Sequence, residues 1–183
     1  MKRWIIMGMG PVVVLTLGWN MKVSMADDDE HWEHTQDVAA VENPIYKEEC
    51  GSCHMAYPPG LLPGRSWEKM MASLDDHFGE SAELDSATAA KLSRFLVDHS
   101  ADAAPNYRRS RKIMRDLPNE STPLRITELT YFRHEHREIP DRLITANPEV
   151  GSLSNCNACH QKAELGSFRE REINISGYGQ WDD

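Results

Sequence analysis

The sequence contains Cys50-Gly-Ser-Cys53-His54 and a second copy of the same pattern, Cys156-Asn-Ala-Cys159-His160. The two copies use all four cysteines of the 183-residue chain. C-x-x-C-H is the spacing at which a c-type haem is attached. Two thiols can add to the two vinyl groups of one porphyrin, and the adjacent histidine then lies beneath the iron as its fifth ligand. We therefore expect two covalently bound haem c groups, attached through both cysteines of each motif, with His54 and His160 as proximal ligands.

Other uses of the four cysteines explain the pattern less well. An exported chain could pair them as disulfides. A zinc site built from two C-x-x-C pairs expects about 15–20 residues between the pairs, and Cys53 and Cys156 are much farther apart. A redox-active C-x-x-C needs a βαβ context, of which the sequence gives no sign. Haem attachment is favoured because both motifs contain the histidine and no cysteine is left over.

The beginning of the chain has the three parts of a secretory signal peptide. Lys2 and Arg3 supply positive charge, an apolar run extends from Trp4 to about Leu17, and small residues occupy the −3 and −1 positions of a cleavage site, Ser24 and Ala26. The alternative is a transmembrane anchor, but two glycines and a proline interrupt the run, which is shorter than the roughly 18–20 residues of a spanning helix. We expect residues 1–26 to be cleaved after Ala26, a periplasmic location and no stable membrane insertion.

The chain is acidic, with a formal net charge of −9 that becomes more negative once the basic leader is removed. Nucleic acid is therefore excluded as a partner, because phosphate binding requires a basic surface. A basic protein partner is favoured, because opposite charge steers encounter.

Helix signals lie on both sides of the first cysteine. Asn43 and Pro44 suit the N-cap and the first position of a helix that runs into Cys50. A proline-rich loop follows at residues 57–64. We expect a carbonyl of this loop to accept the Nδ1 hydrogen of His54 and fix its ring, with a plain surface loop as the alternative.

A second helix is expected from a cap at Ser66 to a stop at Gly79. Its apolar residues recur at three- and four-residue steps and form one stripe: Trp67, Met70, Met71, Leu74 and Phe78. His77 lies on this stripe, where a large apolar cofactor would need an iron ligand. We therefore expect His77 as the sixth ligand of the first haem, with Met70, Met71 and His99 as alternatives.

A third helix is expected to begin at Asp85 or Ser86 and to end near His99. One of its faces is apolar: Ala89, Leu92, Phe95 and Leu96. A histidine at a helix C-terminus is favourable to the helix dipole, which is a sufficient explanation for His99.

The sixth ligand of the second haem must come from upstream of its motif. A helix is expected from Thr127 to His136, with Ile126, Leu129, Phe132 and His136 on one face. His134 shares a different face with Thr130 and Tyr131, so we favour His136 over His134. Two further histidines, His31 and His34, lie in an acidic segment expected to be a solvated tail, with a weak metal site as the alternative.

The chain resembles the soluble dihaem cytochrome c family. The resemblance is carried by motifs spread over most of the chain: Glu49–His54, Tyr57-Pro58-Pro59, Leu61-Leu62-Pro63, Ser66-Trp67, His77-Phe78-Gly79-Glu80, Leu84-Asp85, Arg125-Ile126-Thr127, His136-Arg137-Glu138-Ile139, Asn155–His160 and Gly166-x-Phe168. It implies an N-terminal domain similar to a class I cytochrome c and a smaller, irregular C-terminal haem domain. It also implies low-spin iron with two histidine ligands at both sites, and His77 and His136 match the family's histidine positions. Partners implied are soluble haem proteins or membrane cytochromes of the b561 type.

The fold is expected to be mainly α, because no segment shows convincing strand-like alternation. We expect an acidic mobile N-terminus at 27–39, a cytochrome c-like domain with haem 1 at 40–104, and a C-terminal domain with haem 2 at 105–183. Residues 107–115 carry five positive charges. They form either a solvated helix face or a surface whose arginines pair with haem propionates or dock a partner.

Electron transfer is the expected function, with no catalytic residues and no substrate at either iron. The alternatives are a dihaem enzyme of the peroxidase or reductase kind and a haem-based ligand sensor. Both alternatives need an open or displaceable sixth position, whereas candidate sixth ligands exist for both haems.

Overall fold

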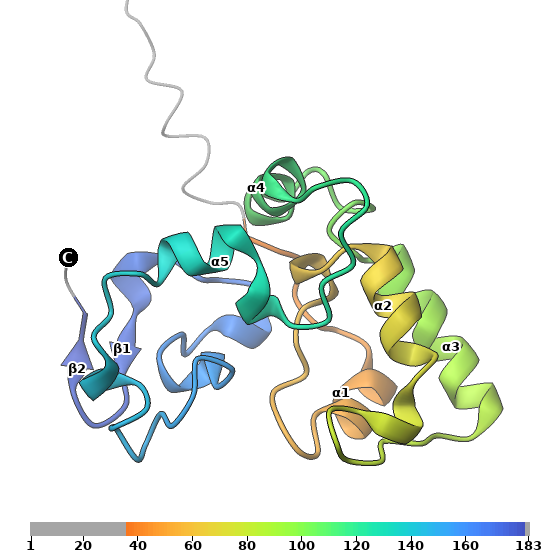
Figure 1. The fold of residues 1–183 in the computed structure, drawn as a ribbon, viewed down its shortest axis with the longest axis horizontal. Coiled ribbons are helices and arrows are strands. Elements are labelled where there is room, and N and C mark those ends of the chain that lie inside the picture. Colours follow the sequence, from red (N-terminus) through yellow and green to blue (C-terminus); the bar gives the residue numbers. More distant parts are fainter. Residues whose placement is uncertain (1–35, 182–183) are drawn as a thin grey trace, which may run out of the picture. The chain divides into compact units, whose positions relative to one another are not determined.

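The computed structural model describes residues 36–181, which belong to one compact unit. The described part is mainly helical (Figure 1). Its helices and strands are α1 (Pro44–Cys50), α2 (Gly64–Met71), α3 (Ser86–Asp98), α4 (Arg108–Asp116), α5 (Thr130–Glu135), β1 (Asn174–Ile175) and β2 (Gly179–Gln180). Single turns of 3-10 helix lie at Pro59–Leu61, Leu74–Asp76, Ile126–Glu128, Asp141–Leu143, Cys156–Ala158, Ala163–Leu165 and Glu170–Glu172. The expected mainly α class is confirmed, while the division at 104/105 stays a prediction.

The expected signal peptide and the histidines His31 and His34 lie outside the described residues. Within residues 36–181, no helix has the length and apolar character needed to cross a bilayer.

Side-chain caps begin two of the helices where the sequence predicts them. The Asn43 carboxamide oxygen accepts the amide hydrogen of Tyr46 at 3.0 Å, and Pro44 occupies the first position of α1. Asp85 accepts the amides of Ala87 and Thr88, both at 3.0 Å, at the start of α3. Each cap satisfies amides that have no partner within the helix, which fixes where the helix starts.

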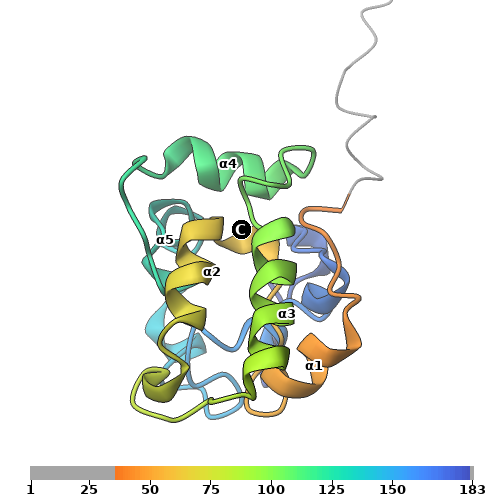
Figure 2. The same cartoon turned by 90° about the vertical axis from the view of Figure 1, so that its right-hand side faces the viewer.

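The first half of the described chain is built around α2 and α3, which pack side by side (Figure 2). Leu92 and Leu96 of α3 and Trp67 of α2 are almost fully buried. The indole nitrogen of Trp67 donates to the carbonyl of Pro59 at 2.8 Å, so this large ring is buried without an unpaired polar group.

The second helix differs from its prediction at both ends. Pro63 is the N-cap, while Ser66 lies inside α2, and α2 ends at Met71, well before Gly79. After the 3-10 turn, the amide of His77 donates to the carbonyl of Glu80 at 2.7 Å. The two residues between them have positive φ, +60° at Phe78 and +99° at Gly79. A tight two-residue turn therefore replaces the last part of the expected helix.

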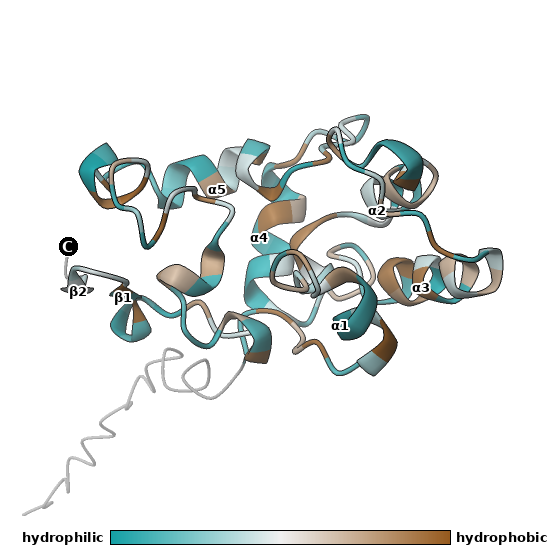
Figure 3. Cartoon of the chain, turned by 90° about the horizontal axis from the view of Figure 1, so that it is seen from below, coloured by the Kyte–Doolittle hydropathy of each residue, from teal (hydrophilic) through white to brown (hydrophobic). Residues whose placement is uncertain are grey.

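The fourth helix joins the two halves. It contacts the 3-10 turn at Pro59–Leu61 and also α5. The buried hydroxyl of Ser110 donates to the carbonyl of Gly60 at 2.8 Å. Figure 3 shows hydrophilic and hydrophobic residues mixed along the α4 ribbon, as expected for a helix with one buried face.

The second half has less regular structure. The expected helix over 127–136 is interrupted at Leu129, whose φ of −61° and ψ of 134° are extended, and only α5 is a true helix there. The antiparallel hairpin β1–β2 pairs Asn174 with Gln180. A small apolar cluster supports this half: Leu143, Ile144, Val150 and Ile175.

The start of the described chain is tied into the second half. Asp37 and Val38 are buried, with 2% and 0% of their surface exposed, and their amides both donate to the carbonyl of Gly166, at 3.0 and 3.1 Å. The expectation of a mobile tail reaching residue 39 is therefore wrong for these two residues, because backbone pairing and burial fix them.

Candidate haem-binding sites

No disulfide joins the four cysteines, all of which lie in the described residues. Burial raises the pKa of Cys50 and of Cys156 to about 11, which keeps both thiols protonated at neutral pH. Zinc binding and thiol–disulfide exchange both require the thiolate. Among residues 36–181, no group of three or more histidine, cysteine or acidic side chains is placed to hold a metal ion. The geometry therefore gives no support to a zinc or a redox-thiol site.

The first motif histidine faces His77. The ring centroids of His54 and His77 are 6.2 Å apart, and the ring planes make an angle of 25°. A bond between a transition metal and an imidazole nitrogen is about 2 Å, so two imidazoles on opposite sides of one metal have centroids about 6 Å apart. The gap between the two rings therefore fits a single iron atom.

The orientation of the His54 ring is fixed on two sides. Its Nδ1 hydrogen is donated to the carbonyl of Met55 at 2.8 Å, and Tyr57 stacks on the ring with centroids 4.8 Å apart and planes 24° apart. The acceptor is thus Met55, which precedes the proline-rich loop expected to supply it. Because Nδ1 carries the hydrogen, Nε2 is left to bind a metal.

His77 is held by the two-residue turn and not by a helical stripe. Phe78 contacts its ring edge-on with centroids 4.8 Å apart, and the Arg125 guanidinium lies 3.9 Å over the Phe78 ring. Burial, together with the charges of His54 and Arg125, lowers the pKa of His77. A neutral imidazole is the form that binds a metal.

The alternatives for this ligand lie in different environments. His99 is exposed, and its Nδ1 is bonded to the carbonyl of Phe95 at 2.8 Å. Met70 lines a hollow of about 200 Å³ together with His77, and Met71 is half-buried. The structure thus brings His77 to His54, while iron ligation by His77 stays a prediction.

The second motif histidine faces His136. The ring centroids of His136 and His160 are 6.1 Å apart, and their planes make an angle of 75°. Both rings line a cavity of about 380 Å³. Both motif cysteines and several apolar side chains also line it: Cys156, Cys159, Leu129, Ile144, Val150 and Phe168. Thiols, two opposed imidazoles and an apolar wall are what a covalently attached haem requires.

His136 and His134 are separated clearly by the structure. The Nδ1 hydrogen of His136 is donated to the carbonyl of Phe132 at 2.8 Å, and the Phe132 ring stacks on His136 with centroids 3.9 Å apart. His134 is exposed, and its Nδ1 lies 2.8 Å from Nη1 of Arg137. His136 is therefore the histidine brought to the second motif, although its ligation stays a prediction.

Both histidines of the second site are held in the neutral form. Burial, the neighbouring His136 and Arg109 lower the pKa of His160 to about 4. Burial is also the main reason why the pKa of His136 is lowered. These are the conditions for two metal-binding imidazoles, because protonation would compete with the metal.

Arg109 lies beside the second site, and the sequence does not predict its partners. Arg109 belongs to the basic run, but its side chain is only 14% exposed and forms an ion pair with buried Asp37. It also contacts Phe168, whose ring meets His160 edge-on with centroids 5.3 Å apart. No periodic pattern connects Asp37, Arg109 and Phe168, so only the folded chain shows that they meet.

Comparisons with known proteins agree with this geometry. A family model described as dihaem cytochrome c matches residues 46–168. The chain is similar to the diheme cytochrome c of Shewanella baltica OS155, with 42% identity, 76% of this chain and 98% of that chain covered, and a TM-score of 0.64. It is similar to the diheme cytochrome c of Rhodobacter sphaeroides, with 42% identity, 72% and 100% covered, and a TM-score of 0.64. No curated protein matched.

Proposed function

Because the chain belongs to the dihaem cytochrome c family, whose members carry two covalently bound c-type haems, we propose that it transfers electrons through two low-spin haems with two histidine ligands each. The proposed axial pairs are His54 with His77 and His136 with His160. The proposed attachment sites are the cysteines of the two motifs: Cys50, Cys53, Cys156 and Cys159.

One observation carries the proposal. Both motif histidines face a second histidine at the separation that one metal atom spans, 6.2 Å at the first site and 6.1 Å at the second. A filled sixth position leaves no place for a substrate on the iron and limits structural change between redox states. This favours a carrier over an enzyme or a ligand sensor.

When bound, each haem supplies a centre that gains and loses one electron. The chain supplies fixed ligands and an apolar enclosure. Carbonyl groups of Met55 and Phe132 set the tautomer and direction of His54 and His136, so that Nε2 of each ring is available. Two imidazole ligands give a lower reduction potential than an imidazole and a methionine thioether would.

The location and the partner belong to the same proposal. The basic and apolar start of the sequence supports export to the periplasm. The family resemblance supports a soluble haem protein or a membrane cytochrome of the b561 type as the redox partner. The acidic chain, with its formal net charge of −9, would favour a partner with a basic docking face.

An absorption spectrum of the purified haem protein tests the function. We expect two low-spin haems in both oxidation states and no spectral change when carbon monoxide is added to the reduced protein. A high-spin fraction or a carbon monoxide shift in the wild-type protein would instead support the enzyme or the sensor.

Ligand variants test the proposed pairs. His77→Ala and His136→Ala should each convert one haem to a high-spin form that binds carbon monoxide. His99→Ala and His134→Ala are the matched controls and should leave both haems low-spin. If a control variant opens a haem and its counterpart does not, the corresponding pair is wrong.

A further inference from the structure

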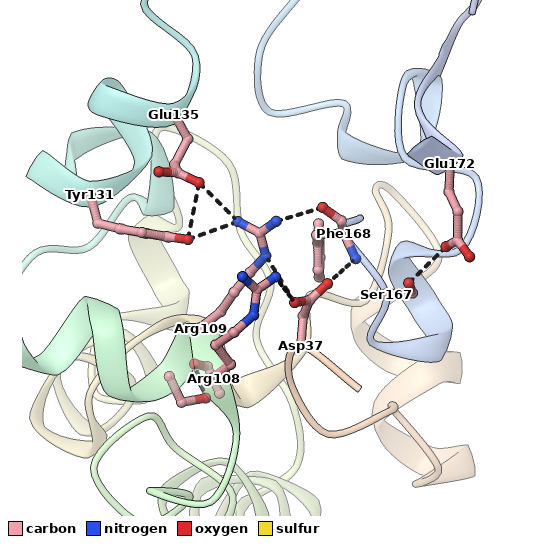
Figure 4. A network of polar contacts seen from close by, with 10 residues as sticks. Asp37, Arg108, Arg109, Tyr131, Glu135, Ser167, Phe168 and Glu172 are labelled. Atoms are coloured by element: carbon pink, nitrogen blue, oxygen red, sulfur yellow. Dashed lines mark hydrogen bonds and ion pairs between the residues drawn. The ribbon is translucent and has the colours of Figure 1, made fainter. Parts of the chain in front are cut away.

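The side chain of Arg109 is the centre of a polar network beside the second site (Figure 4). It extends from α4, is only 14% exposed, and lines the same cavity as His136 and His160. Its hydrogen bonds and ion pairs reach segments that are distant in sequence and that lie on different sides of the guanidinium. An arginine in this position can fix the relative placement of those segments, because its donors form a rigid planar fork.

One arm of the network reaches the helix that ends at His136. Nη1 of Arg109 donates to the hydroxyl of Tyr131 at 2.8 Å and lies 3.4 Å from the carboxylate of Glu135. The Tyr131 hydroxyl also donates to Glu135 at 3.2 Å. Glu135 is the last residue of α5 and directly precedes His136. This arm therefore holds the end of α5 from which His136 projects.

The other arm reaches the segment that packs against His160. Nη2 of Arg109 donates to the carbonyl of Phe168 at 2.5 Å, and the guanidinium carbon lies 5.8 Å from the Phe168 ring centroid. The same ring meets His160 edge-on. One side chain thus contacts a neighbour of each proposed axial ligand without contacting either imidazole.

Two further charges complete the cluster. Asp37 accepts a hydrogen bond from Nη2 of Arg108 at 2.7 Å, and its Oδ1 lies 3.6 Å from Nε of Arg109. Asp37 also accepts the amide hydrogen of Phe168 at 2.8 Å. The network therefore contains two guanidinium groups and two carboxylates. Loss of Arg109 alone would leave an excess negative charge beside the second haem.

We propose that Arg109 is a positioning residue of the second haem site, which holds the segments carrying His136 and Phe168 in register and favours the reduced state through its charge. The proposal rests on the proposed function. Uptake of one electron lowers the charge of the site by one, so a nearby fixed positive charge favours reduction. Because the guanidinium is mostly withdrawn from water, its charge is weakly screened.

The test uses the full haem protein and three variants. Arg109→Gln removes the charge, and Arg109→Lys keeps the charge but loses the planar fork. Arg115→Gln is the matched control, because Arg115 lies on the same helix, is 68% exposed and pairs with Asp116. Redox titration gives the potential of each haem, and electron paramagnetic resonance reports the geometry of each axial pair.

For Arg109→Gln we expect the reduced-to-oxidised ratio of the second haem at a fixed potential to fall about tenfold, which is about 59 mV for one electron. The first haem should be unchanged, as should both haems in Arg115→Gln. Arg109→Lys should restore the potential of the second haem but shift its g values.

The wild-type spectrum separates the two proposals. A wild-type spectrum without two low-spin haems would refute the proposed function. Two low-spin wild-type haems with no difference between Arg109→Gln and Arg115→Gln overturn the role of Arg109, as does an equal fall of both potentials. If Arg109→Gln does not accumulate, the test uses Arg109→Lys and Tyr131→Phe instead. Unchanged g values of the second haem in both variants would overturn the proposal.

Discussion

The hydroxyl of Tyr57 donates a hydrogen bond of 2.8 Å to the carbonyl of Ser154. Tyr57 also stacks on His54, and Ser154 lies two residues before Cys156. One side chain therefore connects His54 of the first motif to the backbone that precedes the second motif. The two proposed haem sites are mechanically joined at this point.

Replacing Tyr57 with phenylalanine separates the two contacts of this side chain. The ring and its stacking on His54 remain, while the hydrogen bond to Ser154 is lost. We expect Tyr57→Phe to lower the free energy of unfolding by about 1 kcal/mol, the usual net value of one hydrogen bond. Urea denaturation followed by circular dichroism measures it.

Tyr57→Leu is the matched variant, because it also removes the stacked ring. It should alter the electron paramagnetic resonance signal of the first haem, which Tyr57→Phe should leave unchanged. Equal signals in the two variants would show that the stacking does not orient His54.

The two proposed axial pairs should give different low-spin signals. The ring planes make 25° for His54 and His77 but 75° for His136 and His160. The angle between axial imidazoles sets how the iron d orbitals split, so near-parallel planes give a rhombic signal and near-perpendicular planes give one large g value. We expect one signal of each kind from the oxidised protein at low temperature. His77→Ala should remove the rhombic signal and His136→Ala the other; the reverse result would contradict the geometry.

Asp37 should make stability depend on pH. Burial alone would raise the pKa of Asp37, but the Arg109 charge, the Phe168 amide and Arg108 together outweigh burial and lower it. The carboxylate therefore stabilises the fold above its unfolded pKa of about 3.9, and this contribution is lost as the pH falls through the lower folded pKa. We expect Asp37→Asn to cost about 3 kcal/mol near pH 7, the lower end for breaking a buried ion pair.

The measurement is the difference in unfolding free energy between wild type and Asp37→Asn at several pH values. It should shrink as the pH falls below about 4. The control is Asp141→Asn, because Asp141 is exposed. A difference that stays constant from neutral to acid pH would mean that the charge of Asp37 does not contribute.

Gly166 should not tolerate a side chain. Its φ is +76°, and a Cβ atom there would collide with the backbone carbonyl of Val38. Gly151 has a similar φ of +70° but no contact under 3.9 Å at the corresponding position. We expect Gly151→Ala to cost about 1–2 kcal/mol from backbone strain alone. Gly166→Ala should cost on the order of 3 kcal/mol or more, because the backbone must also move. Equal losses in thermal or urea denaturation would refute the close approach.

Local signals predicted the parts of the fold that local interactions determine. The caps at Asn43 and Asp85 lie where the sequence placed them, because each side chain bonds to amides two or three residues ahead. The four-residue spacing of Phe132 and His136 predicts that they share a helix face that excludes His134. The two rings do stack in the structure, although the expected longer helix is broken at Leu129.

The errors arise where the chain leaves regular structure. The spacing of the apolar residues predicts a helix through His77, yet α2 ends at Met71 and a turn presents His77 to His54. The Asp76 carboxylate accepts the amide of Gly79 at 2.9 Å, a local bond that competes with helical pairing. The Arg109 network could not be predicted for another reason. Its members are far apart in sequence, and no pattern of residue types or spacing indicates that they are in contact.

The bond between the Asp37 carboxylate and the Phe168 amide spans 131 positions of the chain. Residue 37 is synthesised long before residue 168, so this hydrogen bond can form only after nearly all of the described chain has been made. Closing so large a loop is slow relative to forming nearby turns. The hydrogen bond between Asp37 and Phe168 therefore forms only after the cysteines of both motifs have been synthesised.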